Sequence, residues 1–482
     1  MTKPLKNQTE MKTNSYLLLL LFCAQLTWAQ TFVGYETDNF NGIHGILVNP
    51  GNVTLQKNRN EINLLSVGGT VSNDFAELTP TDVLNIITGD FDPTLLPNGM
   101  IGDNNTAYGN LEAIGPSFIR DFSGRYDGVL SFGAYTRFRK ISNQRNVNGN
   151  LFTGLVSQFP NENFTINQDS LRGTTHAWSE VGGTLGYRIN RYTNSDHIEN
   201  FKFGISVKWL RGVQVELDTS RVITGDYLAG TSQLNLNGDL GQLRLGSGEI
   251  DEVSNSIGQG LGIDLGFVYE RQTSTSTEPD VEDDDRALNQ YRYKFGVSVL
   301  DIGRINYGDV VLDNYVLDGT VNTNDFQGDA NYIQVLRANG FQAEPTSNKL
   351  KMGLPTRLRL EADWKFRPNW YVNAVGNLSL VNKDNLANNH VINSATLTVR
   401  RETRKFSAYL PITLSEFGGL EVSGLGVDAG IGFNVFGVIH VGSGTIFTSL
   451  LAGNETMNNT ANFYVGLKVP RSWLQWEERD RR

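Results

Sequence analysis

Five charged residues occupy every second position of one short segment, a spacing that suits side chains acting together. They are the odd positions of TRLRLEADWKF, residues 356–366: Arg357, Arg359, Glu361, Asp363 and Lys365. In a β-strand alternate side chains share one face, so all five would project to the same side. They could line a selective pore, or they could pair across strands, since unpaired buried ions are costly. We expect the paired network.

The even positions of the same segment are apolar: Leu358, Leu360, Ala362, Trp364 and Phe366. In a soluble sheet the ions would face water and the apolar side chains would face a core. In a membrane barrel the orientation is inverted, with apolar side chains on lipid and ions in the lumen. This segment alone fits both, so the rest of the chain decides.

Residues suited to catalysis or metal binding do not form a known motif. The five His are scattered, and neither a HExxH helix, a GxSxG elbow nor a phosphate loop occurs. His176 with Ser179 and Glu180 could be an active site, although polar residues at a strand end explain them better. The acidic run Asp280–Asp285 lacks the Gly and the final Glu of an EF-hand, so we interpret it as a solvated turn. We predict no catalytic, metal or cofactor site and no enzyme.

The first 29 residues resemble a cleavable signal peptide. Lys3, Lys6 and Lys12 precede an apolar run, and Thr27-Trp28-Ala29 ends in a small residue before Gln30. Cleavage would remove the only cysteine, Cys23, and with it any disulfide. Losing three Lys and one Glu would change the net charge from −10 to −12, which disfavours nucleic acid as a partner.

Two-residue alternation recurs along the mature chain and predicts about fourteen strands. Several candidates reach ten residues or more, long enough to cross a bilayer at a tilt, and the chain shows no later apolar run suited to a membrane helix. The candidate strands are 61–73, 110–120, 127–141, 175–190, 200–216, 258–272, 291–308, 353–367, 370–381, 391–401, 404–415, 423–434, 437–446 and 461–470.

The connections alternate between long and short, as they do in outer-membrane barrels, where the long loops lie outside. The expected outer loops include 217–257 and 309–352, whereas 273–290 would be a long periplasmic turn. A missed strand between 217 and 257 is the alternative, because Gln233–Leu245 also alternates. A soluble β-sandwich or solenoid would explain the alternation but neither the strand length nor the asymmetry of the loops.

The prediction is therefore an all-β protein with one domain, an antiparallel up-and-down transmembrane β-barrel of about 14 strands in the cell outer membrane. We divide the chain into a signal peptide, 1–29; an N-terminal plug-like segment, 30–60; the barrel, 61–470; and a charged tail, 471–482. The Gly- and Asn-rich segment 30–60 lacks alternation, so we expect loop there. Its turn Asn49-Pro50-Gly51 could gate a ligand path, although such residues form turns in any plug.

Four stretches resemble a Bacteroidota outer-membrane family of unknown function. They are DNFNGIHGILVNPGNV at 38–53, KWLRG at 208–212, KFGVSVLDIGRINY at 294–307 and GGLEVSGLGVDAGIGF at 418–433. Gly51 stands where that family usually has Ala, a small change. The family is similar to long-chain fatty-acid transporter barrels and to barrels that accompany type IX secretion and gliding. The resemblance implies an architecture and a location rather than an activity.

Three functions remain open at this point. The first is a barrel that binds or passes a hydrophobic small molecule through its lumen and releases it past residues 38–53. The second is a barrel that does not transport and instead docks a protein of a secretion, gliding or envelope complex through its long loops. The third, less favoured, is an outer-membrane hydrolase. The expected partners are outer-membrane lipid and either a hydrophobic ligand or an envelope protein.

Overall fold

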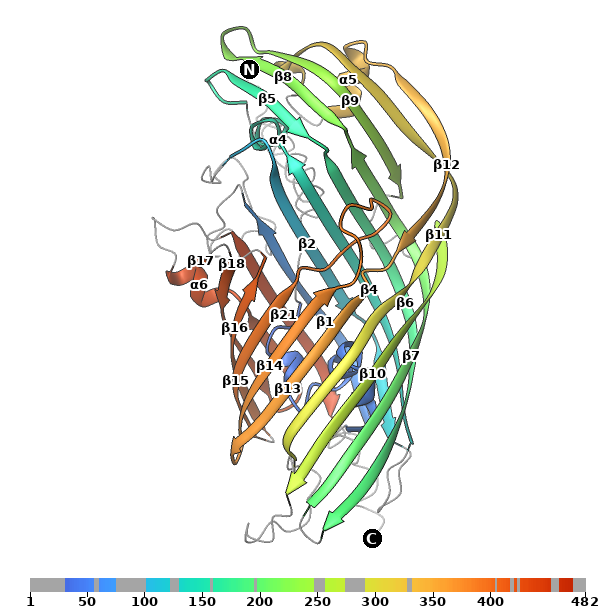
Figure 1. Ribbon diagram of the computed structural model, residues 1–482, viewed down its shortest axis with the longest axis vertical. Coiled ribbons are helices and arrows are strands. Elements are labelled where there is room, and N and C mark those ends of the chain that lie inside the picture. Colours follow the sequence, from blue (N-terminus) through green and yellow to red (C-terminus); the bar gives the residue numbers. More distant parts are fainter. Residues whose placement is uncertain are drawn as a thin grey trace, which may run out of the picture.

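The strands of the computed structural model close into an antiparallel barrel (Figure 1). The strand β1 (Asn60–Asn73) pairs with β2 (Asn105–Ile114) on one side and with β21 (Thr460–Pro470) on the other, so the first and last strands meet. The structure describes residues 31–55, 60–74, 101–121, 130–156, 159–194, 197–246, 256–273, 291–326, 332–403, 405–416, 420–422, 425–451 and 459–470. Within them the wall has fourteen strand positions, as the alternation predicts.

Each of the fourteen segments expected from the sequence contributes to the wall. Interruptions split some positions into two strands, so that β12 and β13, for example, pair in succession along β11. In chain order the remaining wall strands are β3 (Ser117–Asp121), β4 (Leu130–Val147), β6 (Arg172–Asn194), β7 (His197–Thr219), β10 (Gly258–Thr273), β11 (Tyr291–Asn322), β12 (Ala343–Gly353), β13 (Arg357–Arg367), β14 (Trp370–Ser379), β15 (Ser394–Glu402), β16 (Phe406–Ser415), β17 (Leu420–Val422), β18 (Leu425–Ala429), β19 (Ile431–Val435) and β20 (Ile439–Ser443).

The side chains of the wall are oriented as in a membrane barrel, with apolar residues on the outer surface and ions in the lumen. On β13 Leu360 is 43% exposed on the outer surface, whereas Arg359 is 2% exposed inside. The same arrangement recurs around the barrel, where exposed apolar side chains include Leu185, Phe203, Leu265, Phe295, Leu397 and Leu410. An apolar outside and an ionic inside suit lipid, and the closed wall excludes a sandwich or solenoid.

A folded head stands above one end of the barrel, which we call the upper end (Figure 1). Its five-stranded sheet has the order β5–β8–β9–β11–β12 and contains β5 (Phe164–Asp169), β8 (Val222–Leu228) and β9 (Gln233–Leu245). Short helices belong to it as well: α4 (Gly149–Val156), η4 (Ala229–Thr231), η6 (Thr323–Phe326) and α5 (Tyr332–Ala338). The head buries its own apolar cluster, which includes Phe159, Leu234, Tyr315, Ile333 and Leu336.

The expectation of long loops at 217–257 and 309–352 is wrong. The wall strands β7 and β11 continue upward beyond their expected ends, and β9 hydrogen-bonds to both of them. The alternation of Gln233–Leu245 does mark a strand, but that strand extends the head rather than adding a position to the wall. Gly and Asn residues within these segments concealed the continuous pairing.

The segment before β1 lies inside the barrel as a plug, which we define as residues 31–55 (Figure 1, dark blue). It contains η1 (Tyr35–Thr37), α2 (Ile43–Val48) and η2 (Pro50–Leu55), so the expected loop is in part helical. These turns are too short for a helical period to be visible in the sequence. Apolar plug side chains pack with wall residues, among them Ile114, Tyr135, Tyr409 and Tyr464.

Several expected features lie outside the described residues: the signal peptide 1–29, most of the acidic turn 273–290 and the charged tail 471–482. A last short helix, α6 (Ile446–Leu451), follows β20. Among the residues that the structure describes, helices with the length and apolarity to cross a membrane are absent.

Candidate functional site: the plugged lumen

The plug residues 49–54, which begin with the turn Asn49-Pro50-Gly51, lie against three glycines that face one another across neighbouring strands; the turn meets Gly204 and Gly266, and Val53 and Thr54 meet Gly186. Gly186 of β6 is opposite Gly204 of β7, which is opposite Gly266 of β10. A Cβ on Gly204 would lie 2.1 Å from the carbonyl carbon of Pro50, and one on Gly266 would lie 2.2 Å from Oδ1 of Asn49. The missing side chains therefore form the groove that receives the turn.

Asn49 also hydrogen-bonds to the wall itself. Its amide donates to the carbonyl oxygens of Phe267 and Val297, at 3.1 and 3.4 Å, on the adjacent strands β10 and β11. Its Oδ1 accepts a hydrogen bond from the Gly51 backbone at 3.0 Å, which closes the turn. The sequence singled out these three residues as a turn, and the structure places them where the plug is fastened.

Three of the alternating ions of β13, namely Arg359, Glu361 and Asp363, meet partners from other elements. Arg359 Nη1 lies 2.6 Å from Oε1 of Glu36 in the plug. Lys294 Nζ of β11 lies 2.7 Å from Oε1 of Glu361, and Arg400 of β15 pairs with Asp363. Lys365 is half-buried near the lower end. These contacts agree with a paired network rather than an open charged pore.

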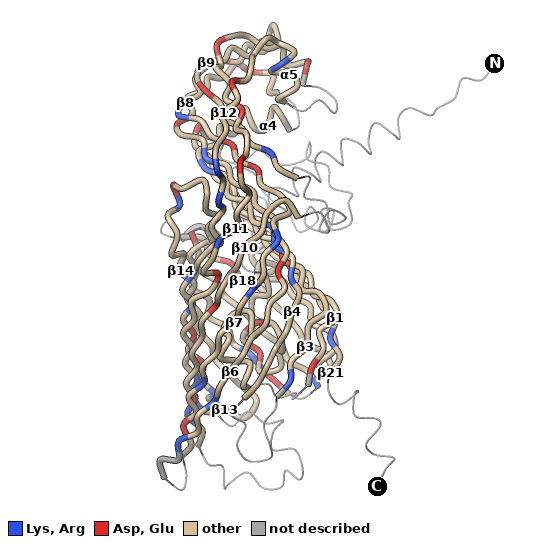
Figure 2. Tube along the Cα trace, turned by 90° about the vertical axis from the view of Figure 1, so that its right-hand side faces the viewer, with Lys and Arg blue, Asp and Glu red and all other residues tan. Residues whose placement is uncertain are grey.

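A second ion cluster, not anticipated from the sequence, surrounds Asp301. Its Oδ1 lies 2.8 Å from Arg139 Nη1 and 2.6 Å from Lys208 Nζ. Lys208 also contacts Asp264 at 2.8 Å, and the Asp301 backbone N–H donates to that carboxylate at 2.6 Å. Asp301 has φ 60° at an irregularity in the β10–β11 pairing, and this bulge turns its side chain inward. In Figure 2 both signs of charge are interspersed along the strands.

Two of the stretches that carried the resemblance thus meet in one place. KWLRG supplies Lys208 and KFGVSVLDIGRINY supplies Asp301. In the sequence, this cluster is indicated only by a lysine and an aspartate within strands whose apolar residues alternate. The bulge that turns Asp301 inward cannot be located from that alternation. The stretch 38–53 lies within the plug.

The residues considered for hydrolysis have separate partners and do not converge on one another. His176 Nε2 lies 2.7 Å from the Tyr307 hydroxyl, and the His176 ring packs beside Trp178. Glu180 accepts a hydrogen bond from Trp178 Nε1 at 2.7 Å and lies near two arginines. Ser179 belongs to the alternate strand positions, so it points away from both. Within the described residues no cluster of His, Cys, Asp or Glu is suited to a metal ion.

A cavity lies between the upper side of the plug and the wall, with about 430 Å³ of empty space including its opening. Ionic and amide side chains of the wall line it together with plug residues. The lining is Thr31, Phe32, Glu36, His44, Leu47, Val48, Glu112, Ile114, Arg137, Arg357, Arg359 and Asn377. We call this space the plug cavity.

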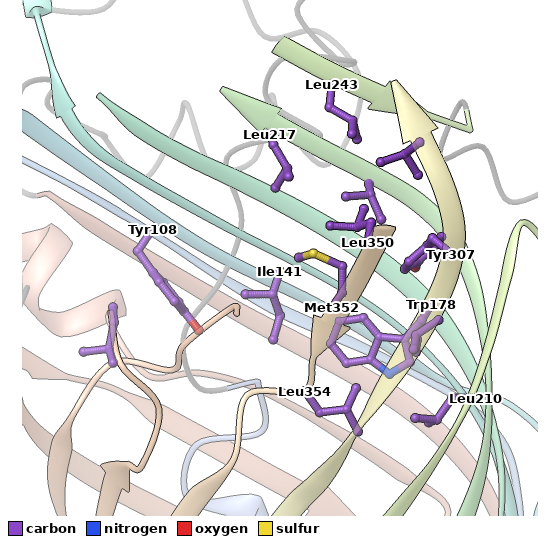
Figure 3. Close-up of a cluster of buried hydrophobic side chains, with 14 residues drawn as sticks. Tyr108, Ile141, Trp178, Leu210, Leu217, Leu243, Tyr307, Leu350, Met352 and Leu354 are labelled. Carbon is purple, nitrogen blue, oxygen red and sulfur yellow. The ribbon is translucent and has the colours of Figure 1, made fainter. Parts of the chain in front are cut away.

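An apolar cluster lies above the plug cavity, where the barrel joins the head (Figure 3). On β2 Tyr108 is four residues above Glu112, and on β4 Ile141 is four residues above Arg137, roughly 13 Å along each strand. The cluster also contains Trp178, Leu210, Leu217, Leu243, Tyr307, Leu350, Met352 and Leu354. The upper lumen is therefore apolar, and the lower lumen is ionic and plugged.

His44 of the plug is buried among aromatic rings. It meets Phe32 and Tyr35 edge-on, with ring centroids 4.5 and 4.9 Å away, and its Nδ1 lies 3.2 Å from the Asn41 carbonyl oxygen. Burial, with Lys468 nearby, lowers the pKa of His44 to about 3. The imidazole is therefore neutral while the plug is in place.

The model of DUF5723, a family of unknown function, matches residues 50–439. The chain belongs to this family. The match begins at Pro50 in the plug and ends at Ile439 in β20, so it includes the ion cluster and the plug cavity wall from Glu112 to Asn377. A search of curated proteins found no match.

Several solved structures resemble this DUF5723 chain at low sequence identity. A TodX ΔS2S3 mutant monoaromatic hydrocarbon channel is 11% identical with a TM-score of 0.43, covering 93% of this chain and 98% of the other. The toluene transporter TbuX of Ralstonia pickettii is 11% identical with a TM-score of 0.38, covering 89% and 94%. A FadL homologue of Pseudomonas aeruginosa is 8% identical with a TM-score of 0.39, covering 92% and 99%.

Proposed function

We propose that this protein is an outer-membrane barrel that binds a hydrophobic small molecule in its upper lumen and passes it inward when the plug shifts. One observation carries the proposal: an apolar cluster lies directly above a lumen that is closed by a separate plug segment. A barrel that only anchored a partner would need no apolar cluster over a plug. The exposed apolar belt of the wall supports the membrane location.

The plug is held by contacts that a small movement would break. Arg359–Glu36, the hydrogen bonds of Asn49 and the hydrogen bond from Asn39 Nδ2 to Tyr291 at 3.0 Å are all polar. Lipid-soluble ligands are excluded from such an ionic surface by the cost of removing water from the ions. Passage therefore requires the plug to shift, and fixing the plug to the wall tests the mechanism.

A disulfide can provide that lock. A Cβ on Gly444 of the wall would lie 3.2 Å from the Cβ of Val33 in the plug, close to the roughly 3.5–4.5 Å found in disulfides. In cells producing the barrel, we expect uptake of labelled decanol above the empty-vector rate. Oxidised V33C/G444C should return uptake to that rate, and dithiothreitol should restore it. The single variant V33C is the control, and unchanged uptake by a fully cross-linked barrel would refute plug movement.

The head supports a second candidate function, the docking of an envelope protein. It folds around its own core above the lipid-facing belt and exposes Val311 and Val316 on its sheet. A ligand entrance alone would not require a separate sheet with its own apolar core. Affinity purification of the full chain from its native envelope should retain a stoichiometric protein that V311K/V316K loses. Retention of that protein by the variant would reject docking through Val311 and Val316, which lie on opposite faces of the sheet.

A further inference from the structure

The plug cavity contains more guanidinium donors than its carboxylates engage. Three arginines line it, namely Arg137, Arg357 and Arg359, against two carboxylates, Glu36 and Glu112. Both carboxylates are already in use. Glu112 lies 2.9 Å from Arg137 Nε and accepts a hydrogen bond from Thr31 Oγ1 at 2.9 Å, while Glu36 pairs with Arg359.

Arg357 is the arginine without a counter-ion. Among the described residues it makes no ion pair and no side-chain hydrogen bond, and its Nε is buried without an acceptor. Asp301, the carboxylate that interacts with Arg357 electrostatically, already pairs directly with Arg139 and Lys208. An unpaired buried cation is unfavourable, so this position favours an anion from outside the chain.

Arg359 adds further donors beside it. Its side chain is 3% exposed, and although Nη1 reaches Glu36, its Nε and Nη2 have no acceptor among the described residues. Arg357 and Arg359 are two positions apart on one face of β13, so their Cα atoms are about 7 Å apart. Asn377 is directly opposite Arg359 on β14 and also lines the cavity. Forked guanidinium groups at this spacing suit one small oxyanion, which they can bind with paired hydrogen bonds.

Phe32, Leu47, Val48 and Ile114 form the apolar part of the lining, which Thr31 and His44 complete. The apolar cluster lies immediately above, since Leu354 precedes Arg357 by three residues. A bound molecule would thus meet oxyanion donors on the β13 side and apolar surface on the plug side and overhead. This combination fits an amphiphile better than a free inorganic anion or a neutral hydrocarbon.

We propose that the plug cavity binds the oxyanion head group, a carboxylate or a phosphate ester, of an amphiphile whose apolar part extends into the upper lumen. Arg357 and Arg359 donate the hydrogen bonds. Because it specifies the ligand class, this inference rests on the proposed function. It also assigns a ligand-binding role to the two arginines that otherwise belong to the ion network of β13.

Equilibrium dialysis of the folded full chain in detergent, corrected for empty micelles, tests the proposal with three probes of one chain length: decanoate, decyl phosphate and decanol. We expect at least one anionic probe to bind about tenfold more tightly than decanol, the effect of a charge-assisted hydrogen bond. R357Q should remove that preference and leave decanol binding unchanged. R367Q, an exposed position at the lower end of the same strand, should behave as wild type.

The outcomes separate this inference from the proposed function. Preference for decanoate alone identifies a carboxylate head group, and preference for decyl phosphate alone identifies a phosphate ester; either supports the site. Equal binding of all three probes, or a preference that survives R357Q, overturns the anion site while leaving a hydrophobic ligand in place. Failure of every probe to bind wild type refutes the proposed function itself. The heat-dependent gel mobility of barrels verifies that R357Q is folded.

Discussion

Pro50 occupies the space that a side chain on Gly204 would need: a Cβ at Gly204 would lie 2.1 Å from the carbonyl carbon of Pro50. The conflict is between backbone atoms of the plug and a Cβ fixed to β7, so rotation of a side chain cannot relieve it. Any larger residue at position 204 would therefore force the turn to move away from β7.

Gly204→Ala should displace the Asn49-Pro50-Gly51 turn while leaving the barrel closed. The added methyl group cannot fit beside Pro50, whereas the pairing of β7 with its neighbours is unaffected. Single-barrel conductance in a planar bilayer should rise relative to wild type. Gly376→Ala, where no atom lies within 4 Å of the new Cβ, should leave the conductance unchanged. An equal conductance for G204A and wild type would show that the turn does not restrict the lumen.

A charge on the outer belt should destabilise the barrel in proportion to its contact with lipid. Leu410 is 48% exposed on β16, and Leu410→Arg should lower the free energy of unfolding in lipid vesicles by roughly 2–4 kcal/mol if it lies near the bilayer midplane. Val316 is 64% exposed in the head, and Val316→Arg should cost well under ~1 kcal/mol. Urea titrations measure both, and a similar cost for the two would place the head in lipid as well.

Neutralising Asp301 should be expensive because its partners stay charged. Asp301→Asn keeps the shape of the side chain but leaves Arg139 and Lys208 in the closed lumen with less compensation, a loss of roughly 3–5 kcal/mol. Asp313 pairs with Arg337 at 3.0 Å in the head, where the two side chains are 33% and 53% exposed. Asp313→Asn should therefore cost ~1 kcal/mol or less. Comparable losses of unfolding free energy would disprove the distinction.

Acid should weaken the seating of the plug through His44. Its pKa is about 3 in the docked plug against the usual ~6.5 once released, so the released plug binds a proton that the docked plug does not. Docking is therefore insensitive to this group above pH ~6.5 and weakens as pH falls from there toward 3. Tyr35, His440 and Lys468 face the ring, and all three side chains remain in His44→Phe. The conductance of H44F should rise less on acidification than that of wild type.

The wall was predictable because each of its strands repeats one physical rule. Alternation on segments such as 356–366 and 404–415 follows from having lipid on one face and a closed lumen on the other. Counting these segments predicted the number of strands. The TRLRLEADWKF pattern fitted either a soluble sheet with its ions in water or a membrane barrel with its ions in the lumen. The pairing of β1 with β21, which closes the wall, decided in favour of the barrel.

The head and the lumen could not be predicted in the same way. Whether β7 and β11 end at the membrane or continue depends on whether β9 is available to pair, which is a property of distant segments. The sequence named Arg357 and Arg359 together as ions of one face. Arg359 pairs with Glu36 of the plug, more than 300 residues away in the chain, whereas Arg357 pairs with no carboxylate among the described residues. Contacts over such separations cannot be deduced from local alternation.

The seam between the first and last strands bears on how the molecule is assembled. Lys468 of β21 pairs with Glu61 of β1 at 3.4 Å and also donates to the carbonyl oxygen of Phe40 in the plug. Residues of the plug and of β1 are thus held by β21, which follows the other wall strands in the chain. We expect the plug to occupy its place before the sheet closes, because the finished seam is completed on its surface. The segment 31–55 then serves as an internal template for biogenesis, and its deletion should slow barrel closure even where transport is not required.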